Sequence, residues 1–204
     1  MSQPHPDSAV LEPRSTSEPR RVLGISGSLR RDSYNRLLLR AAAQVAPTTV
    51  GFVAWDGLKA VPPFDEDDEA APPPPVVSLR EAIAGVDALL IATPEYNASL
   101  PGQLKNALDW ASRPYETSVL RGKVVAVIGA SPSPSGAVRS QAEVRTVLAA
   151  TGADVLDVEL AIPRCFEQFD FEGLLAAPHR HTLRRILEQL AARARTGDTL
   201  LPVA

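Results

Sequence analysis

Two short segments of this chain combine residue types that could hold a phosphorylated ligand. The first is Gly27-Ser28-Leu29-Arg30-Arg31-Asp32-Ser33-Tyr34-Asn35, where a glycine and small hydroxyl residues open an expected helix. The free N–H groups and the dipole of a helix N-terminus favour an anion, and hydroxyls with a guanidinium supply further donors. The segment therefore predicts a phosphate cradle built from Ser28, Arg30, Ser33 and Asn35.

The second segment is Pro94-Glu95-Tyr96-Asn97, an extended turn directly after an apolar run. Its backbone can offer N–H and C=O groups to the edge of a flat heterocycle, and Tyr96 can pack near that ring. A third polar stretch, residues 130–136, follows another apolar run. Together the three segments indicate a bound mononucleotide.

Both main segments also have an explanation that needs no ligand. Ser33 is a good N-cap for the following helix, and Arg30 could be a solvated charge. Pro94–Asn97 could simply connect a strand to a helix, with Ser99 as N-cap and Pro101 in the first turn. Capping and phosphate binding are compatible, so the two interpretations of Ser33 stay open.

Hydrophobic patterning places these segments on alternating strands and helices. Apolar runs predict strands over residues 21–26, 50–55, 87–93, 123–130 and 155–162. A 3.6-residue period and helix-ending residues predict helices over 34–45, 76–84, 100–111 and 136–151, with a last helix marked by Leu183 to Ala194. Strict alternation of strands and helices argues for a parallel sheet covered by helices on both faces.

The strand patterns also predict the order within the sheet. The first, third and fourth strands are nearly continuous apolar runs, as interior parallel strands are. The fifth strand alternates apolar residues with Asp157 and Glu159, which is typical of an edge strand with one solvent-exposed face. We therefore predict a doubly wound, five-stranded parallel α/β sheet of order 2-1-3-4-5. In this order ligands bind beyond the carboxyl ends of strands one and three, where the two main segments meet.

Length and charge narrow the function classes. The chain has 204 residues and a net charge of −3, which fits one domain and argues against a nucleic-acid partner. No apolar run reaches the roughly 18 residues needed to span a bilayer, so no membrane association is expected. We predict a disordered tail over 1–20, one domain over 21–197 and a flexible C-terminus over 198–204.

Cysteine and loop composition add two further expectations. Cys165 is the one cysteine, so no disulfide forms within the chain, which favours a reducing, cytoplasmic compartment. Without a neighbouring histidine to activate it, Cys165 is expected to be a buried bystander. The acidic and proline-rich residues 65–75 are expected to form a solvated surface loop, the alternative being a mobile flap over a site.

At these motifs the chain resembles the NADPH-dependent FMN reductase family, a flavodoxin-like group that includes chromate, quinone and azo-dye reductases. The resemblance covers Arg21 to Leu190. It rests on three motifs: Gly27-Ser28-Leu29-Arg30-x-x-Ser33-x-Asn35, Pro94-Glu95-Tyr96-Asn97-x-Ser99-x-Pro101-Gly102-x-Leu104-Lys105-Asn106-Ala107-x-Asp109-Trp110, and Ser131 with Gly136-x-x-Arg139-x-Gln141.

The resemblance implies a flavodoxin-like FMN-binding domain. It implies that Ser28 through Asn35, Tyr34 included, hold the FMN phosphate, that the isoalloxazine lies along Pro94 to Asn97, and that Ser131 stands at the far side of the ring. A homodimer or homotetramer is also implied. Because a flavin carries its own chemistry, no catalytic side chain and no metal are expected.

The implied activity is a two-step oxidoreductase cycle. NADPH or NADH passes a hydride to the flavin N5, and a small-molecule acceptor then takes the electrons: a quinone, an azo compound, a metal oxyanion or free flavin. The alternatives are a non-enzymatic electron carrier or redox-responsive flavoprotein of the same fold, and a flavin-free interaction domain. The sequence contains no Walker loop, no complete Gly-x-Gly-x-x-Gly and no Gly-x-Ser-x-Gly elbow. The pair His179-x-His181 lacks a cysteine or acidic partner in register for a metal.

Overall fold

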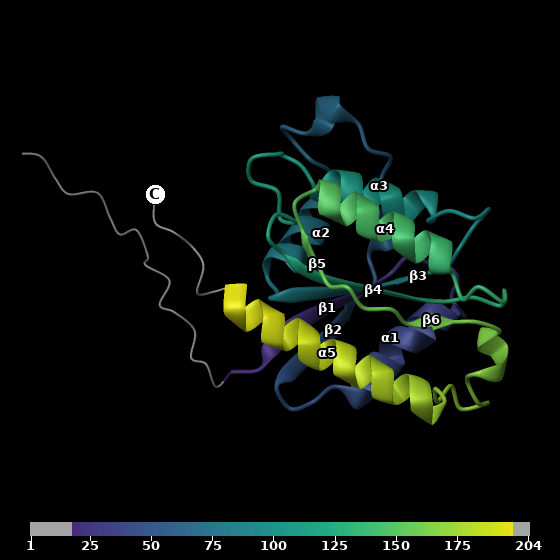
Figure 1. Cartoon of the computed structure of the whole chain (residues 1–204). Helices are drawn as coiled ribbons and strands as arrows, with labels where there is room; N and C mark the ends of the chain where they lie inside the picture. The colour runs from purple at the N-terminus through teal and green to yellow at the C-terminus, as the bar shows by residue number, and fades with distance from the viewer. Residues whose placement is uncertain (1–17, 198–204) are drawn as a thin grey trace, which may run out of the picture.

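The computed structural model describes residues 18–197, which form one parallel sheet between two layers of helices (Figure 1). The strands are β1 (Arg20–Ser26), β2 (Val50–Trp55), β3 (Ala88–Thr93), β4 (Val124–Ala130), β5 (Asp154–Val155) and β6 (Ala161–Ile162). The α-helices are α1 (Tyr34–Val45), α2 (Pro74–Ala84), α3 (Gly102–Ala111), α4 (Val138–Ala150) and α5 (Ala177–Gly197). Short 3₁₀ helices are η1 (Leu58–Ala60), η2 (Glu66–Asp68) and η3 (Cys165–Glu167). Most of the predicted N-terminal tail, residues 1–17, and the predicted C-terminal segment 198–204 lie outside the described residues.

The predicted strand order is confirmed. The sheet runs β2-β1-β3-β4-β5, and every pair is parallel. All residues of β3 and β4 are buried, because these strands have neighbours on both edges and helices on both faces. The carboxyl ends of β1, β3 and β4 therefore meet at one edge of the sheet.

The predicted fifth strand, 155–162, is divided in two. Both β5 and β6 pair with β4, but residues 156–160 between them leave the regular ladder. Leu160 remains buried while Asp157 and Glu159 are exposed, so this segment has the solvent-exposed face that the sequence predicted. An edge strand is paired on one side only, and it can therefore leave its neighbour and return at a smaller cost than an interior strand.

The side chains of successive strand residues point into two separate cores. One core lies between the sheet and helices α1 and α5, and it contains Leu90 from β3. The other lies between the sheet and helices α2, α3 and α4, and it contains Leu89 and Ile91. Figure 1 shows α1 and α5 on one side of the sheet and α3 and α4 on the other.

The segment after β2 is held against α3 by side chains of that helix. Gln103 Nε2 donates to the carbonyls of Leu58 (2.9 Å) and Val61 (2.8 Å). Asn106 Nδ2 and Trp110 Nε1 both donate to the carbonyl of Pro62, at 2.8 and 3.0 Å. Asn106 is thus a structural clamp and not the surface residue that helix position alone suggests.

The acidic segment beyond this clamp forms a surface loop, as predicted. Asp65 to Asp68 are exposed, and the side chain of Asp65 caps η2 by accepting from the Asp67 amide at 3.0 Å. Helix α2 starts at Pro74, two residues before the predicted start, because proline suits the first turn of a helix.

Within residues 18–197 no helix has the length and apolar character needed to cross a membrane.

We predict that Gly136→Ala destabilises the protein by about 2 kcal/mol or more. Gly136 has a φ of +61°, and a Cβ there would lie 2.8 Å from backbone atoms of Ala161 and Ile162. The control is Gly102→Ala, where nothing lies within 4 Å of the added carbon. Chemical denaturation measures both changes, and an equal stability of the two variants would contradict the prediction.

Candidate functional site

The loop after β1 begins close against β3. The amide of Gly27 donates to the Ala92 carbonyl at 2.8 Å. A Cβ on Gly27 would stand 2.9 Å from Leu104 Cδ2 and 3.4 Å from Pro94 Cδ, so a side chain here would push the first loop away from the second. The glycine therefore allows the two predicted segments to meet.

Hydroxyl groups organise the rest of this loop. Ser28 is 3 % exposed, its amide donates to Ser26 Oγ at 3.3 Å, and its own Oγ accepts from the Arg30 amide at 3.4 Å. Ser33 caps α1, as predicted, because its Oγ accepts from the Asn35 amide at 3.2 Å. The Arg30 side chain is exposed, and it lines a hollow together with Ser33.

Asn35 has a structural task that the sequence did not reveal. Its side chain donates from Nδ2 to the Ala130 carbonyl at 2.9 Å and accepts at Oδ1 from the Ala130 amide at 3.0 Å. Asn35 is 2 % exposed, so these bonds are shielded from water. The residue therefore ties the start of α1 to the end of β4, which engages one of its two N–H donors and its carbonyl oxygen.

Tyr34 packs against Phe169, in the segment between β6 and α5. Its ring lies 5.7 Å from the ring of Phe169, measured between centroids, and it packs against the core beside α5. Tyr34 also lines the same hollow as Arg30 and Ser33, so it stays a candidate for the phosphate site together with Ser28, Arg30 and Ser33.

The loop after β3 is a tight turn with two left-handed residues. Tyr96 and Ser99 exchange two backbone hydrogen bonds of 3.0 Å, and Asn97 and Ala98 between them have φ values of +51° and +66°. Pro94 is buried, while the Tyr96 ring is 47 % exposed. The predicted N-cap role of Ser99 is wrong, because Pro101 occupies that position of α3 without a side-chain cap.

Two carboxylates brace this turn against α4. Glu143 Oε2 accepts from the Ser99 hydroxyl at 2.7 Å and from the Leu100 amide at 2.8 Å. Glu95 Oε2 accepts from the Arg139 amide at 3.1 Å. The side chain of Glu95, which was predicted to lie beside the flavin ring, therefore points toward the start of α4. The hydrogen bonds from Ser99 and Leu100 lower the pKa of the Glu143 carboxyl. Glu143 resembles any exposed helix residue in the sequence, so no local signal marks it.

The loop after β4 is organised by a series of hydroxyls. Ser131 Oγ donates to Ser133 Oγ at 3.0 Å and accepts from the Ser133 amide at 3.1 Å. Ser133 Oγ lies 2.9 Å from Ser135 Oγ. Ser131 is 6 % exposed, and it lies next to Ala130, which Asn35 holds.

A fourth loop, after β6, also borders the site, and the sequence analysis missed it. The amides of Arg164 and Cys165 donate to the carbonyls of Ser133 (3.2 Å) and Ser131 (3.1 Å). Burial raises the pKa of the Cys165 thiol to about 11, although the positive charge of Arg30 acts against the rise. Cys165 is therefore a neutral, buried thiol, as predicted.

The structure thus brings the predicted segments together, at the place that the strand order indicates. The loops after β1 and β3 meet at Gly27 and Pro94, and the loops after β1 and β4 are joined through Asn35. No group of three or more acidic, histidine or cysteine residues suited to a metal ion exists in the described part of the chain.

Comparison with known proteins identifies the family. A family model described as NADPH-dependent FMN reductase matches residues 20–167. The chain belongs to the NADPH-dependent FMN reductase family. This confirms the resemblance that the phosphate and ring motifs indicated.

Two relatives of this FMN reductase family member are themselves named as a quinone reductase and an FMN reductase. It is 37 % identical over 177 residues to a 2-hydroxy-1,4-benzoquinone reductase of Burkholderia sp, covering 86 % of this chain and 96 % of the relative. It is 41 % identical over 177 residues to an NAD(P)H-dependent FMN reductase of Pseudomonas aeruginosa, covering 85 % and 95 %.

A solved structure also resembles this family member. The flavoenzyme NAD(P)H:(acceptor) oxidoreductase FerB from Paracoccus denitrificans superposes with a TM-score of 0.78 at 32 % identity. The likeness covers 87 % of this chain and 98 % of FerB. The doubly wound, flavodoxin-like fold is therefore established independently of the motifs.

We predict that Asn35→Ala lowers the free energy of unfolding by about 2 kcal/mol, since it leaves the buried Ala130 amide without an acceptor. The control is Gln44→Ala, at an exposed position of the same helix. Urea denaturation of both variants is the measurement. An Asn35→Ala protein as stable as the control would show that water replaces the lost bonds.

We predict that Glu143→Ala speeds hydrogen exchange at the Leu100 amide and that Glu143→Gln, which keeps an acceptor oxygen but not the charge, speeds it to a smaller extent. The folded-state pKa of Glu143 lies below its ordinary value of 4.5. The extra protection that the carboxylate gives over Gln is therefore present above that value in the native protein and is lost as pH falls through the lowered pKa. Exchange measured by mass spectrometry from pH 3 to 7 tests this, and a pH-independent ratio between the native and Gln proteins would contradict it.

Proposed function

We propose that this protein is an FMN-dependent NAD(P)H oxidoreductase whose acceptors are quinones. The observation that carries the proposal is the meeting of a phosphate-type loop and a ring-type loop at the carboxyl ends of β1 and β3, in a member of this family. Relatives named quinone reductase and 2-hydroxy-1,4-benzoquinone reductase support quinones as the acceptor class. The role of azo compounds, metal oxyanions and free flavin as further acceptors stays a prediction.

The donor set at the start of α1 fits the FMN phosphate. Ser28 and Ser33 offer hydroxyls, and Arg30 offers an exposed guanidinium beside the capped helix end. The first turn of α1 contains no acidic residue, and the one carboxylate in the preceding loop, Asp32, lines the same hollow as Arg30, Arg31 and Arg36. A helix N-terminus with these donors favours a phosphate over a neutral group.

The ring of FMN would lie along the turn after β3. The backbone of Pro94 to Asn97 would face the ring edge, the half-exposed Tyr96 would stand beside it, and Ser131 would lie at the far side. Glu143 of α4 holds this turn from one side, and Glu95 within the turn accepts a hydrogen bond from the Arg139 amide of α4, so the backbone groups of the turn are held in place before a ligand binds.

The chemistry supplied by bound FMN is acceptance of a hydride from the nicotinamide and return of the electrons to the acceptor. The residues of this chain contribute binding and orientation. Ser28, Arg30 and Ser33 would fix the phosphate, and the turn at Pro94 to Asn97 would fix the plane of the ring. No general base is required, which agrees with the neutral thiol of Cys165.

The homodimer or homotetramer expected from the family, and the cytoplasmic location, stay predictions. Gel filtration with light scattering measures the assembly state directly.

The test of the function is a titration of the purified protein with FMN, followed by oxidation of NADPH and NADH with 1,4-benzoquinone as acceptor. We expect tight, stoichiometric FMN binding and quinone-dependent loss of nicotinamide absorbance. Protein that binds no FMN, or that binds it and oxidises neither nicotinamide, would overturn the proposal. Slow oxidation with a stable blue semiquinone would favour the electron-carrier alternative.

We predict that Arg30→Ala weakens FMN binding by about tenfold or more, because one charge-assisted bond to the phosphate is lost. The control is Arg184→Ala, which removes an exposed arginine that pairs with Glu188 on α5. Fluorescence quenching of FMN measures both affinities. Equal affinities in the two variants would remove Arg30 from the phosphate site.

A further inference from the structure

The turn between β3 and α3 contains a residue in a conformation that its type disfavours. Asn97 and Ala98, at the two central positions of the turn, have φ values of +51° and +66°. Two successive positive φ values are the pattern of a type I′ turn, in which asparagine and glycine are favoured because a Cβ crowds the left-handed backbone. Asn97 suits its position, whereas Ala98 stands where glycine is preferred. The backbone of the turn is therefore strained at Ala98.

The contacts of the turn with itself do not explain why Ala98 stays left-handed. The side chains of Asn97 and Ala98 are exposed, so packing does not hold them. The two backbone hydrogen bonds between Tyr96 and Ser99 close the turn. A two-residue turn closed in this way also has a type II′ form, in which only the first central residue keeps a positive φ. That form would relieve Ala98, so another group must favour the observed one.

One face of α4 holds this loop at its start and at its end. Ser140 Oγ lies 2.8 Å from Thr93 Oγ1 at the start of the loop, and both side chains are fully buried. Three residues further along the helix, Glu143 Oε2 accepts from the Ser99 hydroxyl (2.7 Å) and from the Leu100 amide (2.8 Å) at the end of the loop. Residues three apart lie on the same face of a helix, so a rigid element spans the loop.

Of these two attachments, the one at Glu143 adjoins the strained residue. Ser99 directly follows Ala98 in the chain, so the carboxylate fixes the peptide on the far side of the turn. Hydrogen bonds to an ionised acceptor are shorter and stronger than those between neutral groups. The lowered pKa of Glu143 agrees with this, because its first cause is the bond from Ser99 and its second the bond from Leu100.

We propose that Glu143 is a positioning residue for the flavin ring. By holding Ser99 and Leu100, its carboxylate keeps Ala98 left-handed and so sets the direction of the backbone groups that face the ring edge. Without this contact the turn is free to take the type II′ form, in which the peptide between Asn97 and Ala98 is turned over. The inference rests on the proposed function and adds a residue that acts on the ring only through the turn.

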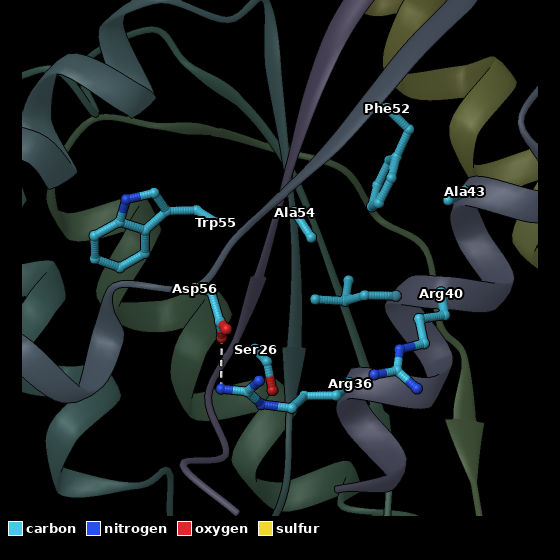
Figure 2. A pocket seen from close by; sticks show the side chains of 9 residues that line it. Ser26, Arg36, Arg40, Ala43, Phe52, Ala54, Trp55 and Asp56 are labelled. Carbon is cyan, nitrogen blue, oxygen red and sulfur yellow. Dashed lines mark ion pairs between the residues drawn. The ribbon is translucent and has the colours of Figure 1, made fainter. Parts of the chain in front are cut away.

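The first test needs no flavin. In NMR spectra of the flavin-free protein, the nuclear Overhauser effect between the amide and α protons of Ala98 is strong only when φ is positive. We expect it to be strong in the native protein and to weaken in Glu143→Ala. The control is Asp56→Ala, which removes another exposed carboxylate, the one that pairs with Arg36 at the end of β2 (Figure 2). An undiminished effect in Glu143→Ala would overturn the proposal.

The second test separates the ring from the phosphate. Glu143→Ala is expected to weaken FMN binding by about fivefold or more, the size of effect that one hydrogen bond has. The affinity for inorganic phosphate, measured by its competition with FMN, is expected to be unchanged, because the phosphate cradle lies in the loop after β1. Glu143→Gln, which keeps an acceptor oxygen, should lose less. An unchanged FMN affinity, or an equal loss for FMN and phosphate, would contradict the proposal.

A second substitution shows whether Glu143 acts through the turn. Glycine adopts a positive φ without the steric penalty, so Ala98→Gly removes the strain that the carboxylate opposes. Alone, Ala98→Gly is expected to change FMN affinity by less than about twofold, and combined with Glu143→Ala it is expected to restore most of the lost affinity. If the loss is the same with and without Ala98→Gly, Glu143 acts by another route and the proposal is wrong.

The inference and the proposed function fail in different ways. If the native protein binds no FMN, the proposed function is wrong, and the NMR measurement still decides whether Glu143 holds Ala98. If the native protein binds FMN and oxidises a nicotinamide while Glu143→Ala keeps the full FMN affinity, the function stands and the positioning role is wrong.

Discussion

The pair of hydrogen bonds between the Asn35 side chain and the Ala130 backbone determines how the loops of this site lie relative to one another. It joins the first turn of α1, where a phosphate would bind, to the end of β4, where the Ser131 loop begins. Both partners are buried, so the cost of breaking the bonds is the cost of leaving polar groups without water. The crevice can therefore keep its shape in the absence of a ligand.

The other loops are held in the same manner, by polar contacts from a neighbouring element. Glu143 and Glu95 connect the turn after β3 to α4, and the amides of Arg164 and Cys165 connect the loop after β6 to the Ser131 loop. Such bracing suits a flavoenzyme, because a flavin reacts by itself and needs a protein that fixes its phosphate and the plane of its ring.

The local charge beside α1 differs in sign from the net charge of this acidic protein. The net charge is −3, yet arginines outnumber carboxylates by one in each of two hollows beside α1. One is lined by Arg36, Arg40 and Asp56, and the other by Arg30, Arg31, Arg36 and Arg40 with Asp32, Asp170 and Glu172. Anionic ligands respond to the nearest groups, because charges beyond about 10 Å are largely screened at physiological ionic strength. A phosphorylated cofactor can thus find partners on a protein whose overall charge would repel it.

Local patterns in the sequence were sufficient for the strand order and for most element boundaries. The apolar runs at 87–93 and 123–130 identified interior strands, and Ser33 with Pro47 marked the limits of α1, because burial on both faces and helix capping leave signals in neighbouring residues.

Other features depended on contacts between residues distant in the chain, which leave no local signal. The division of 155–162 follows from pairing with β4, the role of Glu143 from a turn 43 residues away, and the task of Asn35 from a strand 95 residues away. The sequence by itself therefore determined the fold and the chemical type of its ligand. Only the tertiary structure decided which side chains hold the site in shape, because packing alone brings those groups together.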